Sequence, residues 1–165
     1  MPVHLPDEMY RPPLSRIKIE SKLGIIRESL SELEALSQLN GKEFIADKKN
    51  YAIAEHYLRR ALEATFDIAG HIISRFPFSP GKRPSTLKDL AIALADKKIV
   101  DEKFGKETLV RMAGYRNRLV HFYDEVTEQE LYEIIKTRLG DIEHFAKCGH
   151  EVMTKPKQFG LTIED

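Results

Sequence analysis

The chain has 165 residues, of which 42% are hydrophobic and 32% are charged, and this mix suits one globular domain and excludes a disordered chain. Its 26 basic residues balance its 26 acidic residues, so any contact with nucleic acid must come from a local cluster rather than from a generally basic surface. Cys148 is the single cysteine, which excludes an internal disulfide and a cysteine-rich zinc site.

The first part of the chain predicts an arm and two long helices. Residues 1–13 contain four prolines, and because proline breaks helices we expect an extended arm there. From about Leu14 to Leu39, apolar residues recur three and four positions apart, which predicts a first helix that ends at Asn40-Gly41. A second, long helix is expected over residues 47–74, before a stretch rich in proline and glycine.

The middle of the chain predicts a short helix and a longer one. Ser85 or Thr86 can cap a short helix whose apolar positions lie within residues 87–94. Asp101 can open a fourth helix that runs through Val120.

The last predicted helix starts at a capping box. Thr127 is followed three positions later by Glu130, and apolar residues then recur at helical spacing as far as Phe145. From Gly149 onward the sequence has no clear period, and no segment alternates long enough to predict a sheet.

These elements together predict an all-α protein. Helices joined by short loops favour antiparallel packing, so we expect an up-and-down helical bundle of four main helices plus a short one. The expected organisation is an extended arm over 1–13, the bundle over 14–148 and a C-terminal tail over 149–165. No apolar run is long enough for a membrane span, and the start of the chain does not read as a secretion signal, so we expect a cytoplasmic protein with no membrane contact.

The most unusual segment covers residues 115–124, which read Tyr-Arg-Asn-Arg-Leu-Val-His-Phe-Tyr-Asp. An imidazole can donate or accept a proton at working pH, which suits His121 to proton transfer, and the planar guanidinium of Arg116 matches phosphate oxygens. Cleavage of RNA by its own 2′-hydroxyl needs one group of each kind and no metal. The segment therefore contains the side chains that such a reaction requires.

Helix geometry separates these two side chains. Arg116 and His121 are five residues apart, so on an ideal helix they diverge by about 140°. They meet only if the helix ends or distorts near His121, or if two copies of the chain meet across a symmetric dimer. A purely structural role is also open, because an arginine and a histidine at a helix C-terminus can complement its dipole and bind its last carbonyls.

The segment from Arg116 to Tyr123 resembles the HepT-type form of the HEPN motif, in which arginine is followed by four to six residues, histidine, and a tyrosine two positions later. Residues 51–69 are similar to the long second helix of that family, and Asp124-Glu-Val before the predicted helix at Thr127 is similar to the segment after its motif. The resemblance covers roughly residues 15–148.

The resemblance implies a metal-independent endoribonuclease toxin, without a cofactor, that acts on RNA as a homodimer. It assigns Arg116 to the phosphate and His121 to acid or base catalysis, and Asn117 would orient His121 or the scissile phosphate. Tyr123 corresponds to the tyrosine that an MNT-type nucleotidyltransferase antitoxin adenylylates, and the added charge and bulk would block the cleft. The alternative is a non-catalytic HEPN module that binds RNA or nucleotide, or serves as a dimeric scaffold for a nucleotidyltransferase.

Asp67 is a supporting candidate because it lies in the family-like stretch. It is four residues before His71, and a structural hydrogen bond between these two side chains is the simpler interpretation.

Overall fold

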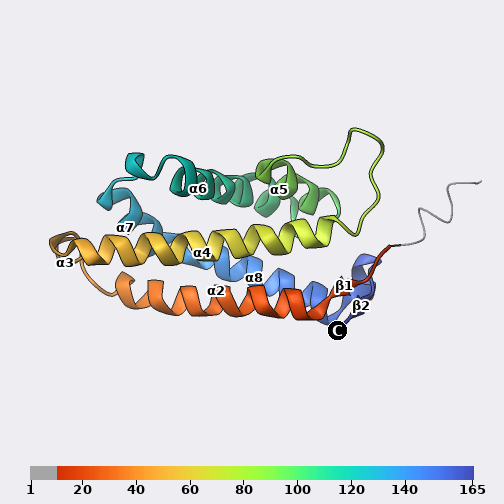
Figure 1. The fold of residues 1–165 in the computed structure, drawn as a ribbon, viewed down its shortest axis with the longest axis horizontal. Helices are drawn as coiled ribbons and strands as arrows, with labels where there is room; N and C mark the ends of the chain where they lie inside the picture. Colours follow the sequence, from red (N-terminus) through yellow and green to blue (C-terminus); the bar gives the residue numbers. More distant parts are fainter. Residues whose placement is uncertain (1–10) are drawn as a thin grey trace, which may run out of the picture.

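Two long helices frame the computed structural model, which describes residues 11–165 (Figure 1). α2 (Arg16–Ser37) begins where the Ser15 hydroxyl accepts a hydrogen bond from the Lys18 N–H, and α4 (Lys48–Ile73) begins where the Asp47 carboxylate accepts from Lys49 N–H. The two helices pack along their length as an antiparallel pair. The two long helices that the sequence predicts are therefore confirmed.

A short helix between them was not predicted. The predicted stop at Asn40-Gly41 falls just after the end of α2 at Ser37, and Asn40 is instead the N-cap of α3 (Gly41–Ala46). Its side chain accepts from the Glu43 N–H at 2.9 Å, and the Glu43 carboxylate accepts from the Asn40 N–H at 3.1 Å. This reciprocal capping box stabilises a helix too short to show a hydrophobic period.

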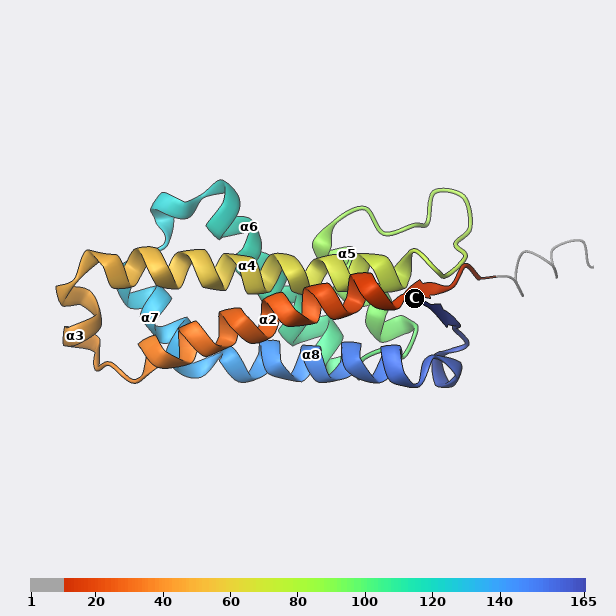
Figure 2. The same cartoon turned by 60° about the horizontal axis from the view of Figure 1, so that its bottom comes forward.

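The rest of the chain packs around α4. The elements are α5 (Leu87–Asp96), a π-helical stretch η1 (Phe104–Leu109), α6 (Val110–His121), a 3-10 turn η2 (Tyr123–Glu125), α7 (Glu128–Thr137), α8 (Leu139–Thr154) and the 3-10 turn η3 (Pro156–Phe159). α5 and α6 lie along one side of α4, and α8 runs beside α2 on the other (Figures 1 and 2). The core contains fully buried side chains such as Leu58 and Leu62 of α4 and Phe145 of α8. The predicted all-α bundle is confirmed.

The C-terminal part differs from the prediction in two ways. The predicted fifth helix is broken at Arg138 into α7 and α8, and α8 continues past Gly149 to Thr154, so the expected boundary at residue 148 lies inside a helix. The end of the chain also forms a minimal parallel sheet, in which β1 (Leu14–Ser15) pairs with β2 (Ile163–Glu164). Of the arm expected over 1–13, residues 1–10 lie outside the described part.

No helix within residues 11–165 has the length and apolar character needed to cross a membrane.

Candidate active site

The motif residues lie at the C-terminal end of α6. This helix runs from Val110 through His121, and Phe122 ends it by donating its N–H to the Arg118 carbonyl at 2.8 Å. Because the backbone stays helical through His121, Arg116 and His121 leave different faces of the helix. A helix end or distortion that would bring them together within one chain does not occur before His121.

Arg116 lies over a small hollow between three helices. The hollow has a volume of about 190 Å³, and its walls come from Arg116 of α6, Glu63, Phe66 and Asp67 of α4, and Leu87 of α5. One guanidinium nitrogen of Arg116 donates to Asn117 Oδ1 at 3.3 Å. The structure therefore brings together Arg116, Asn117 and Asp67, three of the residues that the sequence singled out.

The carboxylate of Asp67 is already paired. Its Oδ2 atom lies 2.9 Å from the Lys22 ammonium of α2, while Arg116 makes no salt bridge within residues 11–165. The positive charge of Arg116 is thus left available for an anion, since Asp67 of the hollow pairs with Lys22 and neither Asp67 nor Glu63 forms a salt bridge with Arg116.

The predicted pairing of Asp67 with His71 is wrong. His71 is buried, and its Nε2 atom accepts a hydrogen bond from the Ser15 N–H at 2.9 Å. Burial, followed by the positive charges of Arg75 and Lys18, lowers the pKa of His71 to about 4. His71 therefore holds the start of α2 against α4 as a neutral acceptor and has a structural role.

His121, Phe122 and Tyr123 form an exposed cluster beyond the hollow. Phe122 and Tyr123 expose 52% and 59% of their surface, and the His121 ring lies beside that of Phe122 with their centroids 6.4 Å apart. The imidazole makes no hydrogen bond to any described residue, so it does not bind the last carbonyls of α6 in the way a structural cap would.

Sequence reasoning missed the partner of Arg118. Its guanidinium forms a two-point ion pair with Glu130 of α7, in which Nη2 lies 2.8 Å from Oε1 and Nη1 contacts Oε2. Thr127 caps α7 by accepting from the Glu130 N–H at 3.1 Å, but the Glu130 carboxylate is taken by Arg118 and the reciprocal half of the predicted capping box is not formed. The ion pair lowers the pKa of Glu130 and raises that of Arg118.

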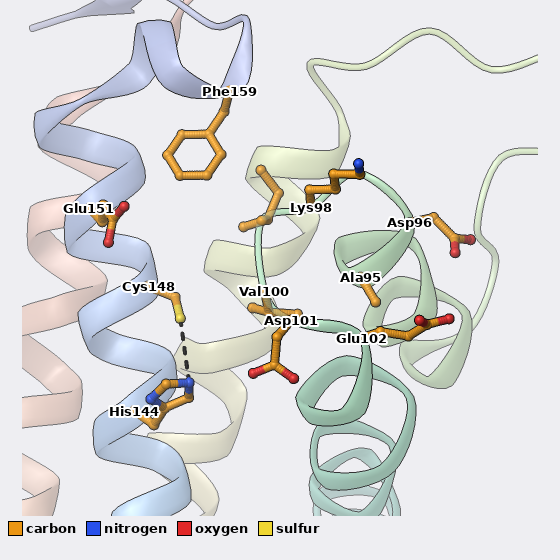
Figure 3. Close-up of a pocket in the computed structure, with 11 residues that line it drawn as sticks. Ala95, Asp96, Lys98, Val100, Asp101, Glu102, His144, Cys148, Glu151 and Phe159 are labelled. Atoms are coloured by element: carbon orange, nitrogen blue, oxygen red, sulfur yellow. Dashed lines mark hydrogen bonds between the residues drawn. The ribbon is translucent and has the colours of Figure 1, made fainter.

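A larger cavity lies away from the motif (Figure 3). It has a volume of about 630 Å³ and is lined by the end of α5, the loop after it, α8 and Phe159. Cys148 Sγ lies 3.9 Å from His144 Nε2 in its wall, and burial, followed by Glu151 and Asp101, raises the pKa of the thiol. No group of three or more metal-binding side chains occurs in the described part of the chain, here or elsewhere.

Comparisons with known proteins identify relatives in sequence and in fold. A tRNA nuclease named HepT from Aphanizomenon flos-aquae is 26% identical over 121 residues, which cover 73% of this chain and 80% of that protein. YutE of Bacillus subtilis is 30% identical over 134 residues, which cover 81% of this chain and 86% of YutE. The solved structure of YutE, described as a cytosolic protein, matches with a TM-score of 0.67 and covers 86% of this chain and 93% of its own.

The fold also matches that of a HEPN toxin. The tri-AMPylated toxin of Shewanella oneidensis, solved in complex with an MNT antitoxin, is 24% identical with a TM-score of 0.65, and the match covers 79% of this chain and 95% of the toxin. The family described as ribonuclease HepT-like matches residues 26–148, which is most of the chain. The chain therefore belongs to the HepT-like ribonuclease family.

Proposed function

We propose that this chain is the toxin of a HEPN/MNT pair and cuts tRNA as a metal-independent endoribonuclease. The observation that carries the proposal is the state of the two motif side chains. Arg116 has no carboxylate partner within residues 11–165, and His121 is exposed and hydrogen-bonded to none of them. The relative named a tRNA nuclease supports tRNA as the substrate.

The chemistry follows from these side chains. His121 accepts the proton of a ribose 2′-hydroxyl, whose oxygen attacks the adjacent phosphorus. The bond from phosphorus to the 5′-oxygen breaks, and a second imidazole, His121 of another copy, donates a proton to that oxygen. Arg116 donates hydrogen bonds to the non-bridging oxygens as their charge grows. The products are a 2′,3′-cyclic phosphate and a 5′-hydroxyl.

Two neighbours support Arg116 in this proposal. Asn117 Oδ1 accepts a hydrogen bond from the guanidinium and so fixes its plane, which is a more direct role than orienting His121. Asp67 lies in the same hollow and is neutralised by Lys22, so it shapes the hollow without pairing with Arg116.

A homodimer supplies what one chain lacks. Because α6 is helical through His121, one copy cannot direct both Arg116 and His121 at the same phosphate. A symmetric dimer places two copies of each side chain around one cleft.

Mixed dimers test whether both imidazoles are needed. If they are, dimers formed from a 1:1 mixture of wild type and His121→Ala should retain only about a quarter of the activity of wild type, since a quarter of random dimers are fully wild type. Retention of half would contradict the shared cleft.

Regulation by a nucleotidyltransferase is the second part of the proposal. Tyr123 is more than half exposed on the 3-10 turn after α6, so a transferase can reach its hydroxyl without disturbing the core. A nucleotide attached there adds bulk and negative charge beside the motif, which would repel RNA. The AMPylated state of the Shewanella oneidensis toxin and its complex with an MNT antitoxin support this assignment.

The test is a cleavage assay on total tRNA in excess chelator with unmodified protein, as verified by mass spectrometry. We expect wild type to cut and His121→Ala to lose about 10²-fold or more of the rate. His150→Ala is the matched control, since His150 is an exposed histidine of α8 away from the motif, and it should cut like wild type. If unmodified wild type leaves tRNA intact, the nuclease proposal fails and the scaffold alternative replaces it.

A further inference from the structure

The segment that follows His121 is held by polar contacts rather than by burial. Phe122, Tyr123, Asp124 and Glu125 are all exposed, and η2 contains no buried residue. The first residue after this segment whose side chain is buried in the hydrophobic core is Val126, which is 5% exposed. The conformation of residues 122–125 therefore depends on hydrogen bonds to their backbone.

One set of these contacts comes from Arg118. Its Nη2 atom contacts the Glu125 carbonyl oxygen at 3.5 Å and also donates to Glu130 at 2.8 Å. The guanidinium thus joins three pieces of the chain, namely α6, the exposed segment and α7. Such a two-point ion pair fixes the plane of the guanidinium more firmly than a single contact would.

The other set comes from α4. The Tyr51 hydroxyl donates to the Val126 carbonyl at 2.7 Å and lies 3.5 Å from the Tyr123 carbonyl. Burial, followed by the charges of Glu55, Glu128 and Glu130, raises the pKa of Tyr51, so its hydroxyl remains a donor at neutral pH. Tyr51 therefore holds the backbone at Tyr123 and Val126, and Arg118 holds it at Glu125.

We propose that Arg118, held in place by Glu130, is a positioning residue that orders residues 122–126 and thereby sets the place of the Phe122 ring against His121. The inference rests on the proposed nuclease function for its effect on activity. It assigns Arg118 an indirect role, since the Glu130 carboxylate occupies two of its donors and one of these donors also meets the Glu125 carbonyl.

The competing role for Arg118 is direct binding of an RNA phosphate. The two roles predict opposite effects for Glu130→Gln. If Arg118 positions the segment, loss of either partner loosens it, and Arg118→Gln and Glu130→Gln change activity in the same direction. If Arg118 binds phosphate, the loss of Glu130 frees the guanidinium and strengthens RNA binding.

The experiment measures kcat and KM on total tRNA, together with amide hydrogen exchange, for wild type and the two variants. Lys106→Gln is the matched control, because the Lys106 side chain is about as exposed as that of Arg118, at 41% against 37%, and forms an ion pair with Glu102 away from the motif. We expect kcat to fall about tenfold or more in Arg118→Gln and Glu130→Gln, with KM within about twofold of wild type, since misplaced catalytic groups slow the chemical step. Arg118→Lys, which keeps the charge but not the planar fork that makes the two-point contact, should restore part of the loss.

Exchange reports on the segment independently of catalysis. The Glu125 and Val126 amides donate to the Phe122 and Tyr123 carbonyls at 3.0 and 3.2 Å, and both should exchange faster in the two variants but not in the control. Unchanged exchange of these amides would overturn the positioning role. A higher KM for Arg118→Gln together with a lower KM for Glu130→Gln would instead make Arg118 a phosphate ligand. If wild type does not cut tRNA, the proposed function fails, and the exchange result alone decides whether Arg118 orders the segment.

Discussion

His71 links the stability of the fold to pH because it is buried in its neutral form. Its Nε2 atom accepts the Ser15 N–H at 2.9 Å, and an imidazole that accepts at this nitrogen cannot also be protonated there. Protonation would break this hydrogen bond and place a positive charge beside Arg75 and Lys18. The hydrogen bond from the Ser15 N–H to His71 anchors the N-terminus of α2 to α4.

The direction of the effect follows from the two pKa values of His71. The folded value is about 4 and the ordinary value is 6.5, so between these values the unfolded chain binds the proton and the folded chain does not. The contribution of His71 to stability is therefore complete above pH 6.5 and is lost as the pH falls towards 4. Since one pKa unit corresponds to 1.36 kcal/mol, the whole contribution is about 3 kcal/mol at most.

The measurement is urea unfolding of wild type and His71→Gln near neutral pH and near pH 4.5. Glutamine can still accept from the Ser15 N–H, but it does not titrate. Between these two pH values, the free energy of unfolding of wild type should fall by about 2 kcal/mol more than that of the variant. An equal fall in both proteins would refute the reasoning, because it would assign the acid sensitivity to other groups.

Three further predictions concern the core and the caps, each measured as a free energy of urea unfolding. Gly105→Ala should cost about 1–3 kcal/mol, because the new Cβ would lie 2.6 Å from Ala95 Cβ and 3.1 Å from the Ala91 carbonyl. Asn40→Ala should cost about 1 kcal/mol by removing the cap of α3, and no loss would mean that packing alone holds this helix. Phe145→Ala should cost about 3–5 kcal/mol as a fully buried ring is lost, and a cost below 1 kcal/mol would contradict its place in the core.

The long helices could be predicted because the spacing of apolar residues along a helix depends only on residues that are close together in the sequence. The α2 and α4 helices follow directly from apolar residues at helical spacing. The features that were missed have another origin. The β1–β2 pair joins Leu14 to Ile163, and the hydrogen bond from Leu14 N–H to the Thr162 carbonyl is likewise a contact between opposite ends of the chain that no local pattern reveals.

In the candidate site, too, the sequence could identify some residues but not the contacts that they make. Arg116, His121 and Tyr123 could be singled out because the motif is continuous in the sequence, although its catalytic role stays a prediction. Their partners could not be read in this way. Helical spacing suggested Asp67 with His71, but in the folded chain each side chain has a better partner from the start of the chain, Lys22 and the Ser15 N–H. Spacing along one helix shows which side chains can meet and does not show what a neighbouring helix offers.

The position of His121 explains why the proposed chemistry requires more than one copy of the chain. Leu119 is buried and holds the end of α6 against the bundle, whereas His121 and its neighbours Phe122 and Tyr123 face outward. An imidazole surrounded by water gains little from fixed dipoles, since electrostatic catalysis depends on a preorganised site from which water is excluded. The core of one chain does not supply such a site around His121. A second chain that covers Phe122, together with the bound RNA, would supply it, so we expect assembly rather than folding to create the active site.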